Sequence, residues 1–283
     1  MRAHSNPALR VLPLVMATAG LALALPAARA AEAGFRQMTV ASPAGEKPAH
    51  FALYYPTADV ARTIPMGPFP QTVAINGAPA PAVKGLIVIS HGTASTELGF
   101  ATLAQALARH GYLVASVEHV GDTWQDTSMR ATPGRYFAER PRQVSRVIDT
   151  VLADPLWSAR LAQGADGRPL IGAIGHSAGG YTVLALAGGK PVLSRLRAHC
   201  ETEAALDPVL CSLSRGIGSA SGQAGGSADG QEEPVRADPR VRAVMALARP
   251  AAHLVMSPAP RQTTMSPGWA TVASASARAS GPA

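Results

Sequence analysis

The chain has 283 residues and a formal net charge of +7, with 25 Lys and Arg against 18 Asp and Glu. Only three of the basic residues are lysines, and the arginines are scattered along the chain. A nucleic-acid-binding protein concentrates positive charge on one face or arm, so this pattern argues against nucleic acid as a partner.

The first 30 residues have the three parts of a secretory signal peptide. A short positive segment ends at Arg10, an uncharged apolar run covers residues 11–25, and a small-residue cleavage signal follows at Ala28-Arg29-Ala30. The alternative, a transmembrane anchor, needs about 20 apolar residues, whereas this run is shorter and contains Pro13. We expect cleavage after Ala30, a periplasmic or secreted mature chain, and no stable membrane span after cleavage.

Segments with strand character recur along the rest of the chain. We predict strands over residues 35–42 and 50–55, joined as an antiparallel hairpin. Residues 63–81 hold many Pro and Gly and predict a long ordered loop. Short apolar segments, typical of buried parallel strands, follow at 86–90, 112–117 and 170–174, and a fourth strand is predicted over 241–247.

Three helices are predicted between these strands. The first has an apolar stripe at i, i+3, i+4 and i+7 over residues 100–107, with Ser95 as its N-cap and Gly111 at its end. The second carries a similar stripe over 144–152, and the third covers 178–187. Strands that alternate with amphipathic helices predict an α/β fold, with a mostly parallel sheet covered on both faces.

The mature chain is long enough for one sizeable core, so we expect one domain over residues 31–250. An insertion at 191–238 interrupts it, and within this insertion the Gly-, Ser- and Ala-rich segment 216–230 is predicted to be disordered. Residues 251–283 predict an irregular, disordered tail.

The two cysteines, Cys200 and Cys211, lie close together in the insertion, in a stretch without strand or helix periodicity. In an exported protein they predict a disulfide that closes a surface loop. Two buried free thiols are the alternative. A metal site is a weaker one, because only His199 lies nearby as a further ligand.

The pentapeptide from Gly175 to Gly179 matches G-x-S-x-G, with Ser177 at its centre. It directly follows a buried strand and opens a helix, which is the context that a nucleophile elbow requires. Ser177 must adopt a strained conformation to project its hydroxyl, and the two elbow glycines leave room for this sharp turn. The alternative is a Gly-rich turn that packs tightly or binds a phosphate.

An oxyanion hole needs two hydrogen-bond donors beside the nucleophile. The backbone N–H of Ala178 is one candidate, because it follows the nucleophile directly. The loop after the first buried strand supplies the other, and there Gly92 permits a sharp turn that places the N–H of Thr93. We expect His91 to hydrogen-bond this loop rather than to serve as a base.

Four segments carry a family resemblance: LIVISHG, HGYLVASVEHVGD, ERPRQVSRVIDTVL and IGAIGHSAGGYTVLALAG. They resemble the bacterial dienelactone-hydrolase-like and platelet-activating-factor-acetylhydrolase-like branch of the α/β-hydrolases, over residues 35–247. The resemblance extends to the stretch 67–69 and to the paired cysteines. It implies an α/β-hydrolase fold and a serine esterase or lipase-like acyl hydrolase without cofactor or metal. Dienelactone hydrolases proper use cysteine, so Ser177 favours ester hydrolysis, and we expect His119 and Asp122 to shape the loop beside the site.

The catalytic acid and base of this fold should follow the nucleophile in the order Asp or Glu, then His. After Asp238 the sequence has no acidic residue, and Asp238 and Asp229 both precede the last predicted strand. His253 is the one candidate base, although it follows that strand closely. A frameshift or truncation near residue 250 would explain the missing acid and base, so we expect the C-terminal strands of the domain to be missing.

Two functions follow from these patterns. The first is an impaired serine hydrolase for carboxylic esters of small or lipid-like acids, with Ser177 as nucleophile and Ala178 and Thr93 holding the oxyanion. The second is an exported, non-catalytic binding protein that keeps a ligand pocket on the same scaffold.

Overall fold

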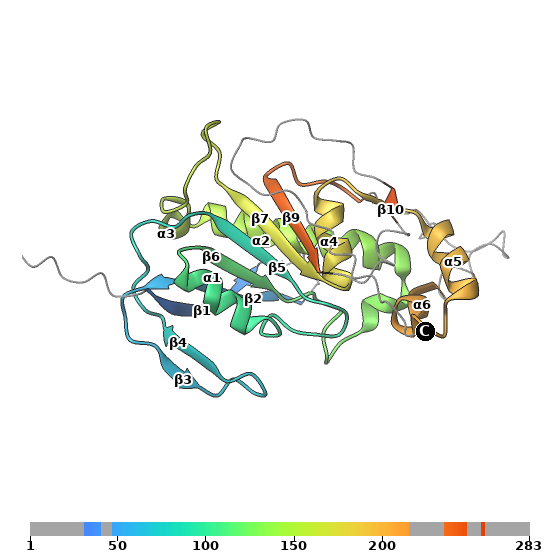
Figure 1. Cartoon of the computed structure of the whole chain (residues 1–283), viewed down its shortest axis with the longest axis horizontal. Helices are drawn as coiled ribbons and strands as arrows, with labels where there is room; N and C mark the ends of the chain where they lie inside the picture. Colours follow the sequence, from blue (N-terminus) through green and yellow to red (C-terminus); the bar gives the residue numbers. More distant parts are fainter. Residues whose placement is uncertain (1–30, 41–46, 215–234, 248–255, 258–283) are drawn as a thin grey trace, which may run out of the picture.

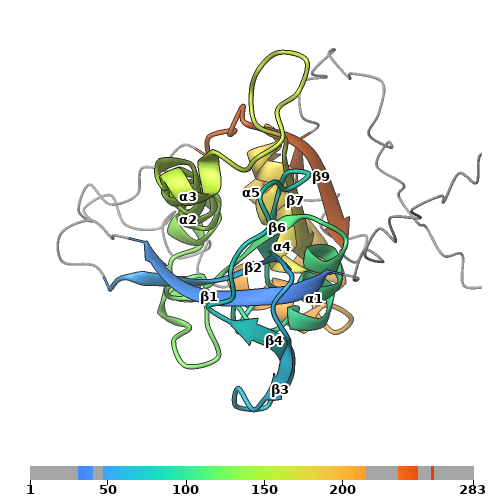
Figure 2. The same cartoon turned by 90° about the vertical axis from the view of Figure 1, so that its left-hand side faces the viewer.

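The structure is a computed structural model, and it describes residues 31–40, 47–214, 235–247 and 256–257. Within these ranges an eight-stranded sheet has the order β3-β4-β1-β2-β6-β5-β7-β9. Helices pack on both of its faces, as Figures 1 and 2 show. The predicted α/β class, with a mostly parallel sheet covered by helices on both faces, is confirmed.

The parallel part of the sheet consists of four strands that were predicted from the sequence. They are β5 (Leu86–Ser90), β6 (Leu113–Val117), β7 (Ile171–His176) and β9 (Val241–Leu247). β5 pairs in parallel with β6 and β7, and β7 pairs in parallel with β9. Their carboxyl ends therefore meet at one edge of the sheet, where ligand sites of α/β folds form.

The N-terminal part of the sheet is mixed. β1 (Glu32–Val40) and β2 (Ala49–Thr57) form the predicted antiparallel hairpin, and β2 runs antiparallel to β6. The predicted loop over 63–81 is wrong in part, because it contains most of β3 (Arg62–Ile64) and all of β4 (Gln71–Ile75). These two strands pair with each other, and β4 adds in parallel to the edge of β1. Such short edge strands leave little periodicity in a sequence rich in Pro and Gly.

The helices divide between the two faces of the sheet, as Figure 2 shows. On one face lies α1 (Ala101–Arg109), which packs against β1, β2 and β6. On the other lie α2 (Pro133–Ala153), α3 (Pro155–Ser158) and α4 (Ala178–Leu186), whose apolar side chains join those of the central strands in the larger core.

The start of α1 differs from the prediction. Ser95 does not cap this helix: Phe100 occupies the N-cap, and Ser95 forms an isolated β-bridge with Thr123. The residues between Ser95 and the helix form two turns instead, in which the N–H groups of Gly99 and Ala101 donate to the carbonyl oxygens three positions earlier. The buried face of α1 is made by its small residues and Gln105, while Leu103 and Leu107 are only partly buried. Small residues let the helix lie close to the sheet.

The first half of the predicted insertion is helical, which the sequence analysis missed. After a two-residue strand, β8 (Lys190–Pro191), come α5 (Leu193–Thr202) and α6 (Pro208–Ser214). A short 3-10 helix, η1 (Ser128–Ala131), lies earlier in the chain, between β6 and α2. The predicted disulfide joins Cys200 on α5 to Cys211 on α6. Leu196 of α5 is fully buried in an apolar cluster with Tyr181 of α4, so these helices belong to the domain rather than to a loose loop.

Several expectations concern residues outside the described ranges. They include the signal peptide, the segment 216–230, His253 and most of the tail. Met256 and Ser257 are described, and as β10 (Met256–Ser257) they pair with β8, so the tail is not irregular throughout. Among the helices of the described ranges, none has both the length and the apolar composition needed to cross a membrane.

Candidate active site

Ser177 lies at the junction between β7 and α4, as the nucleophile elbow predicts. Its backbone has φ 53° and ψ −117°, and its side chain is exposed at the carboxyl edge of the sheet. A non-glycine residue in such a conformation costs on the order of 1–3 kcal/mol. Its N–H donates to the carbonyl oxygen of Leu247 at 3.2 Å, so the end of β9 helps to hold the turn.

The two elbow glycines are required by close backbone contacts. A Cβ at Gly175 would overlap the carbonyl oxygen of Gly179, and a Cβ at Gly179 would overlap that of Ser90. The turn therefore brings the first residues of α4 directly against the end of β5. This packing explains why small residues stand two positions before and two positions after Ser177.

The loop after β5 lies against the elbow. A Cβ at Gly92 would lie 3.4 Å from the Cβ of Ser177 and 3.2 Å from Nδ1 of His176. The structure thus brings the segment that carries Thr93 beside Ser177. Ala178 is the first residue of α4, so its N–H has no acceptor within the helix and is available to a ligand. Both proposed oxyanion donors come from elements that meet at Ser177.

His91 and His119 are fully buried behind this loop, and their ring nitrogens are engaged. Nδ1 of His91 donates to the carbonyl oxygen of Gly92 at 2.6 Å, and its Nε2 accepts from the His119 backbone N–H at 3.1 Å. Nδ1 of His119 donates to Oε1 of Gln143 at 2.9 Å, and its Nε2 accepts from the hydroxyl of Ser90 at 2.8 Å. These bonds give each neutral imidazole a single tautomer.

The electrostatics of this loop keep both imidazoles uncharged. Burial, followed by the nearby Arg140 guanidinium, lowers the pKa of His91 to about 3. The same two causes, in the same order, hold the pKa of His119 well below its ordinary value. Neither imidazole can reach a substrate from this position. As expected, His91 stabilises the loop.

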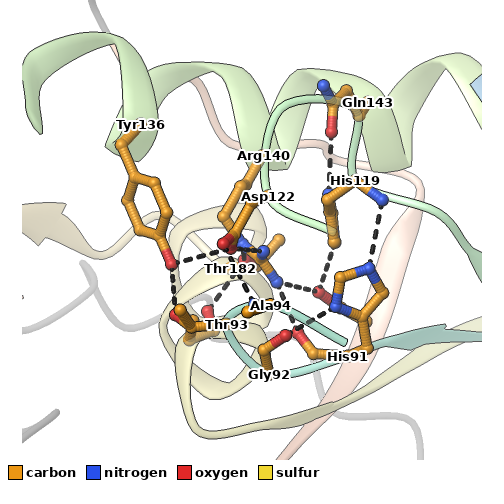
Figure 3. Close-up of polar contacts among 12 residues, drawn as sticks. His91, Gly92, Thr93, Ala94, His119, Asp122, Tyr136, Arg140, Gln143 and Thr182 are labelled. Carbon is orange, nitrogen blue, oxygen red and sulfur yellow. Dashed lines mark hydrogen bonds and ion pairs between the residues drawn. The ribbon is translucent and has the colours of Figure 1, made fainter. Parts of the chain in front are cut away.

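A buried ion pair of Asp122 and Arg140 lies next to these histidines, as Figure 3 shows. Asp122 accepts from the Ala94 N–H at 3.1 Å and from the Tyr136 hydroxyl at 3.0 Å. Burial raises the pKa of Asp122, while Arg140 and these two donors act in the opposite direction. Asp122 and His119 therefore shape the loop, as the sequence analysis expected.

Three residues of α2 in this network were missed by the sequence analysis: Tyr136, Arg140 and Gln143. They are spaced i, i+4 and i+7, so they share one face of the helix. In Figure 3 all three project from α2 towards the loop. Their spacing is the signal that could have identified them. They extend towards the N-terminus the same buried face of α2 that carries apolar side chains from Val144 onwards.

The described residues place no acid or base of a triad beside Ser177. Asp238 precedes β9 and pairs with Arg240 and Ser145, at the opposite end of the strand from the elbow. His199 lies on α5, 3.5 Å from Asp207. His253 lies outside the described residues. Within the described ranges, no three His, Cys, Asp or Glu side chains are grouped to hold a metal ion.

Several solved structures are similar to this chain at low sequence identity. A ferulic acid esterase from Streptomyces cinnamoneus is 23% identical, with a TM-score of 0.44 over 56% of each chain. An S-formylglutathione hydrolase from Staphylococcus aureus is 15% identical, with a TM-score of 0.36 over 56% of this chain and 54% of that one. An acylaminoacyl peptidase from Pyrococcus horikoshii is 16% identical, with a TM-score of 0.44 over 67% and 28%.

The chain spans about half the length of the first two of these proteins. No protein-family model matches the chain, and no curated protein matches it.

Proposed function

We propose that this chain is a serine hydrolase of carboxylic esters, with Ser177 as its nucleophile. The observation that carries the proposal is the left-handed φ of 53° at an exposed serine between a buried strand and a buried helix. Such strain persists where the surrounding structure enforces it and is concentrated at active sites. The proposal also agrees with the dienelactone-hydrolase-like sequence resemblance.

In the proposed reaction the Ser177 hydroxyl attacks the acyl carbon of the ester. The N–H groups of Ala178 and Thr93 donate to the oxyanion that develops on the carbonyl oxygen. A base must take the hydroxyl proton and return it to the alcohol, which leaves as its bond to the acyl carbon breaks. Water then attacks the acyl-enzyme, which releases the acid and restores the Ser177 hydroxyl. Because both ring nitrogens of His91 and His119 are engaged, His253 stays the candidate base. Because the described residues place no acid or base of a triad beside Ser177, the chain as written is proposed to be an impaired hydrolase.

We also propose that the protein works outside the cytoplasm, after cleavage at Ala30. The disulfide between Cys200 and Cys211 supports this location, because disulfides persist in oxidising compartments. The proposed substrates are small or lipid-like esters.

Labelling with a fluorophosphonate tests the nucleophile. We expect a single modified serine, Ser177, identified by peptide mass analysis, and no labelling of Ser177→Ala. Ser158→Ala is the matched control, because Ser158 lies on α3, outside the proposed site, and its hydroxyl donates to the Asp154 carbonyl oxygen. Labelling that survives in Ser177→Ala would refute the assignment. A chain that binds small esters but is never labelled would favour the alternative, a non-catalytic binding protein.

A further inference from the structure

A charged pair is buried completely beneath the proposed oxyanion loop. Arg140 on α2 and Asp122 in the loop after β6 both have side chains that are 0% exposed, and they form a direct ion pair. A buried ion pair generally adds little net stability over apolar side chains of the same volume. Stability alone therefore does not explain why this charged pair is buried beneath the loop.

The pair holds the loop after β5 on both sides of Gly92 and Thr93. Before them, Arg140 donates to the carbonyl oxygen of His91, and its Nη2 lies 3.4 Å from the hydroxyl of Ser90. After them, the carboxylate of Asp122 accepts from the Ala94 N–H at 3.1 Å. Ala94 itself has φ 54°, so the loop is held in a conformation that a free chain rarely adopts.

The same guanidinium is bonded to the nucleophile helix. Nε of Arg140 donates to the hydroxyl of Thr182 on α4 at 3.1 Å. The Thr182 hydroxyl in turn donates to the carbonyl oxygen of Ala178 at 2.9 Å, one helical turn earlier. Arg140 therefore contacts both elements that carry the proposed oxyanion donors, as Figure 3 shows for the loop and for Thr182.

A third link runs through Tyr136, one turn before Arg140 on α2. Its hydroxyl lies 2.7 Å from Oγ1 of Thr93 and donates to Asp122 at 3.0 Å. Tyr136 therefore contacts Thr93, whose backbone N–H is proposed to donate to the oxyanion.

We propose that Arg140, paired with Asp122, is a positioning residue that sets the distance between the N–H groups of Thr93 and Ala178. This inference rests on the proposed function. An oxyanion hole works only when both donors lie about 2.7–3.1 Å from the charge that develops. A misplacement of about 1 Å can cost on the order of a hundredfold in rate. The Arg140 guanidinium suits this role because its rigid fork bonds several acceptors at fixed angles.

The variant Arg140→Lys tests the proposal, because it keeps a positive charge beside Asp122 and loses the fork. We expect labelling of Ser177 by a fluorophosphonate to slow about 10- to 100-fold. The loss should fall on the maximal rate of inactivation, with little change in the concentration for half-maximal rate. Arg146→Lys is the matched control: Arg146 lies on the same helix and pairs with Glu139, away from the loop, and should label at the unsubstituted rate.

A folded Arg140→Lys that labels like the unsubstituted chain would overturn the proposal. If Arg140→Lys does not fold, Tyr136→Phe decides the question, because it removes one hydroxyl and keeps the ring in its apolar cluster. We expect its labelling to slow several-fold, and an unchanged rate would count against positioning.

A second measurement separates this proposal from the proposed function. If Ser177 of the unsubstituted chain is not labelled at all, the proposed function fails. Hydrogen exchange then tests positioning alone: peptides that cover 92–94 and the first turn of α4 should exchange faster in Arg140→Lys than in Arg146→Lys. Equal exchange in the two variants would overturn the positioning role as well.

Discussion

The hydroxyl of Tyr181 on α4 donates to the backbone carbonyl oxygen of Phe137 on α2 at 2.7 Å. Phe137 needs this donor because the residue four positions later is Pro141, which lies inside α2 and has no N–H to give. The hydrogen bond that Pro141 cannot make within α2 is thus supplied by a side chain of α4. Tyr181 and Pro141 are the sequence neighbours of Thr182 and Arg140, which are hydrogen-bonded to each other.

This relationship predicts a coupling between Tyr181 and Pro141. Tyr181→Phe leaves a buried carbonyl unsatisfied and should lower the free energy of unfolding by about 1–3 kcal/mol. In a Pro141→Ala background the restored helical N–H serves Phe137, so the same substitution should cost less. Urea unfolding of the double-mutant cycle measures the difference. Tyr112→Phe is the control, because it removes the same hydroxyl from a partly buried ring that packs in the other core cluster, with α1. Equal costs in both backgrounds would contradict this role of Tyr181.

The buried histidines predict a loss of stability in mild acid. An unfolded chain protonates histidine near pH 6.5, whereas burial lowers the pKa of His91 to about 3 in the folded chain. The unfolded state therefore binds more protons between these values, and stability falls as pH falls below 6.5. His91 alone should cost about 1 kcal/mol between pH 7 and pH 5.5, and His119 acts in the same direction.

Two carboxyl groups oppose this trend, because burial raises the pKa of both Asp122 and Glu118. Both pKa values are raised from ordinary values of 3.8 and 4.5, so the opposing contribution grows as the pH falls towards those values. Urea unfolding at pH 7.0, 6.0 and 5.5 measures the net effect. Stability that stays constant or rises on acidification would contradict the expected net effect of the two imidazoles.

The disulfide predicts local stabilisation of α5 and α6. Cys200 and Cys211 are 11 positions apart, and closing a loop of that length in the unfolded chain is worth about 3 kcal/mol in the chain-entropy model. The Cys200→Ala/Cys211→Ala variant should therefore melt at a lower temperature and be cleaved faster by protease within 193–214. Calorimetry of the oxidised chain, the reduced chain and the variant provides the comparison. An unchanged melting temperature in the variant would contradict the prediction.

Sequence reasoning succeeded where one local pattern determines the structure. The continuous apolar segment at β5 was predicted with its observed bounds, since a strand buried on both faces needs apolar side chains throughout. The bounds of β9 were also predicted correctly, although β9 lies at the edge of the described sheet and several of its side chains are exposed. The strand–turn–helix junction at Ser177 was also located correctly, because close backbone contacts within the turn and with β5 require glycine at positions 175 and 179.

Sequence reasoning failed where tertiary contacts decide the structure. α5 and α6 have weak periodicity of their own and are held by the disulfide and by Leu196 in its apolar cluster. The roles of Tyr136 and Arg140 depend on partners that lie 14 to 50 positions away in the sequence. Local spacing could place these side chains on one face of α2 but could not say what that face contacts.

The chain as written is predicted to hydrolyse short p-nitrophenyl esters at a rate near background. Members of a catalytic triad act as a unit, and loss of the histidine alone costs about a millionfold in a serine protease. An oxyanion hole and substrate binding alone retain on the order of a thousandfold over water. We therefore expect a slow rate with no sharp rise near neutral pH, measured by p-nitrophenolate release against Ser177→Ala.

His253→Ala separates the remaining possibilities for the base. If His253 is not the base, this variant should match the unsubstituted chain in rate and in pH profile. Supplying a downstream segment that carries a strand-end Asp and a late His should then raise the rate by several orders of magnitude, because the nucleophile and oxyanion donors gain the proton acceptor that they lack. Fast turnover by the unsubstituted chain that is abolished in His253→Ala would instead identify His253 as the base and refute the impairment.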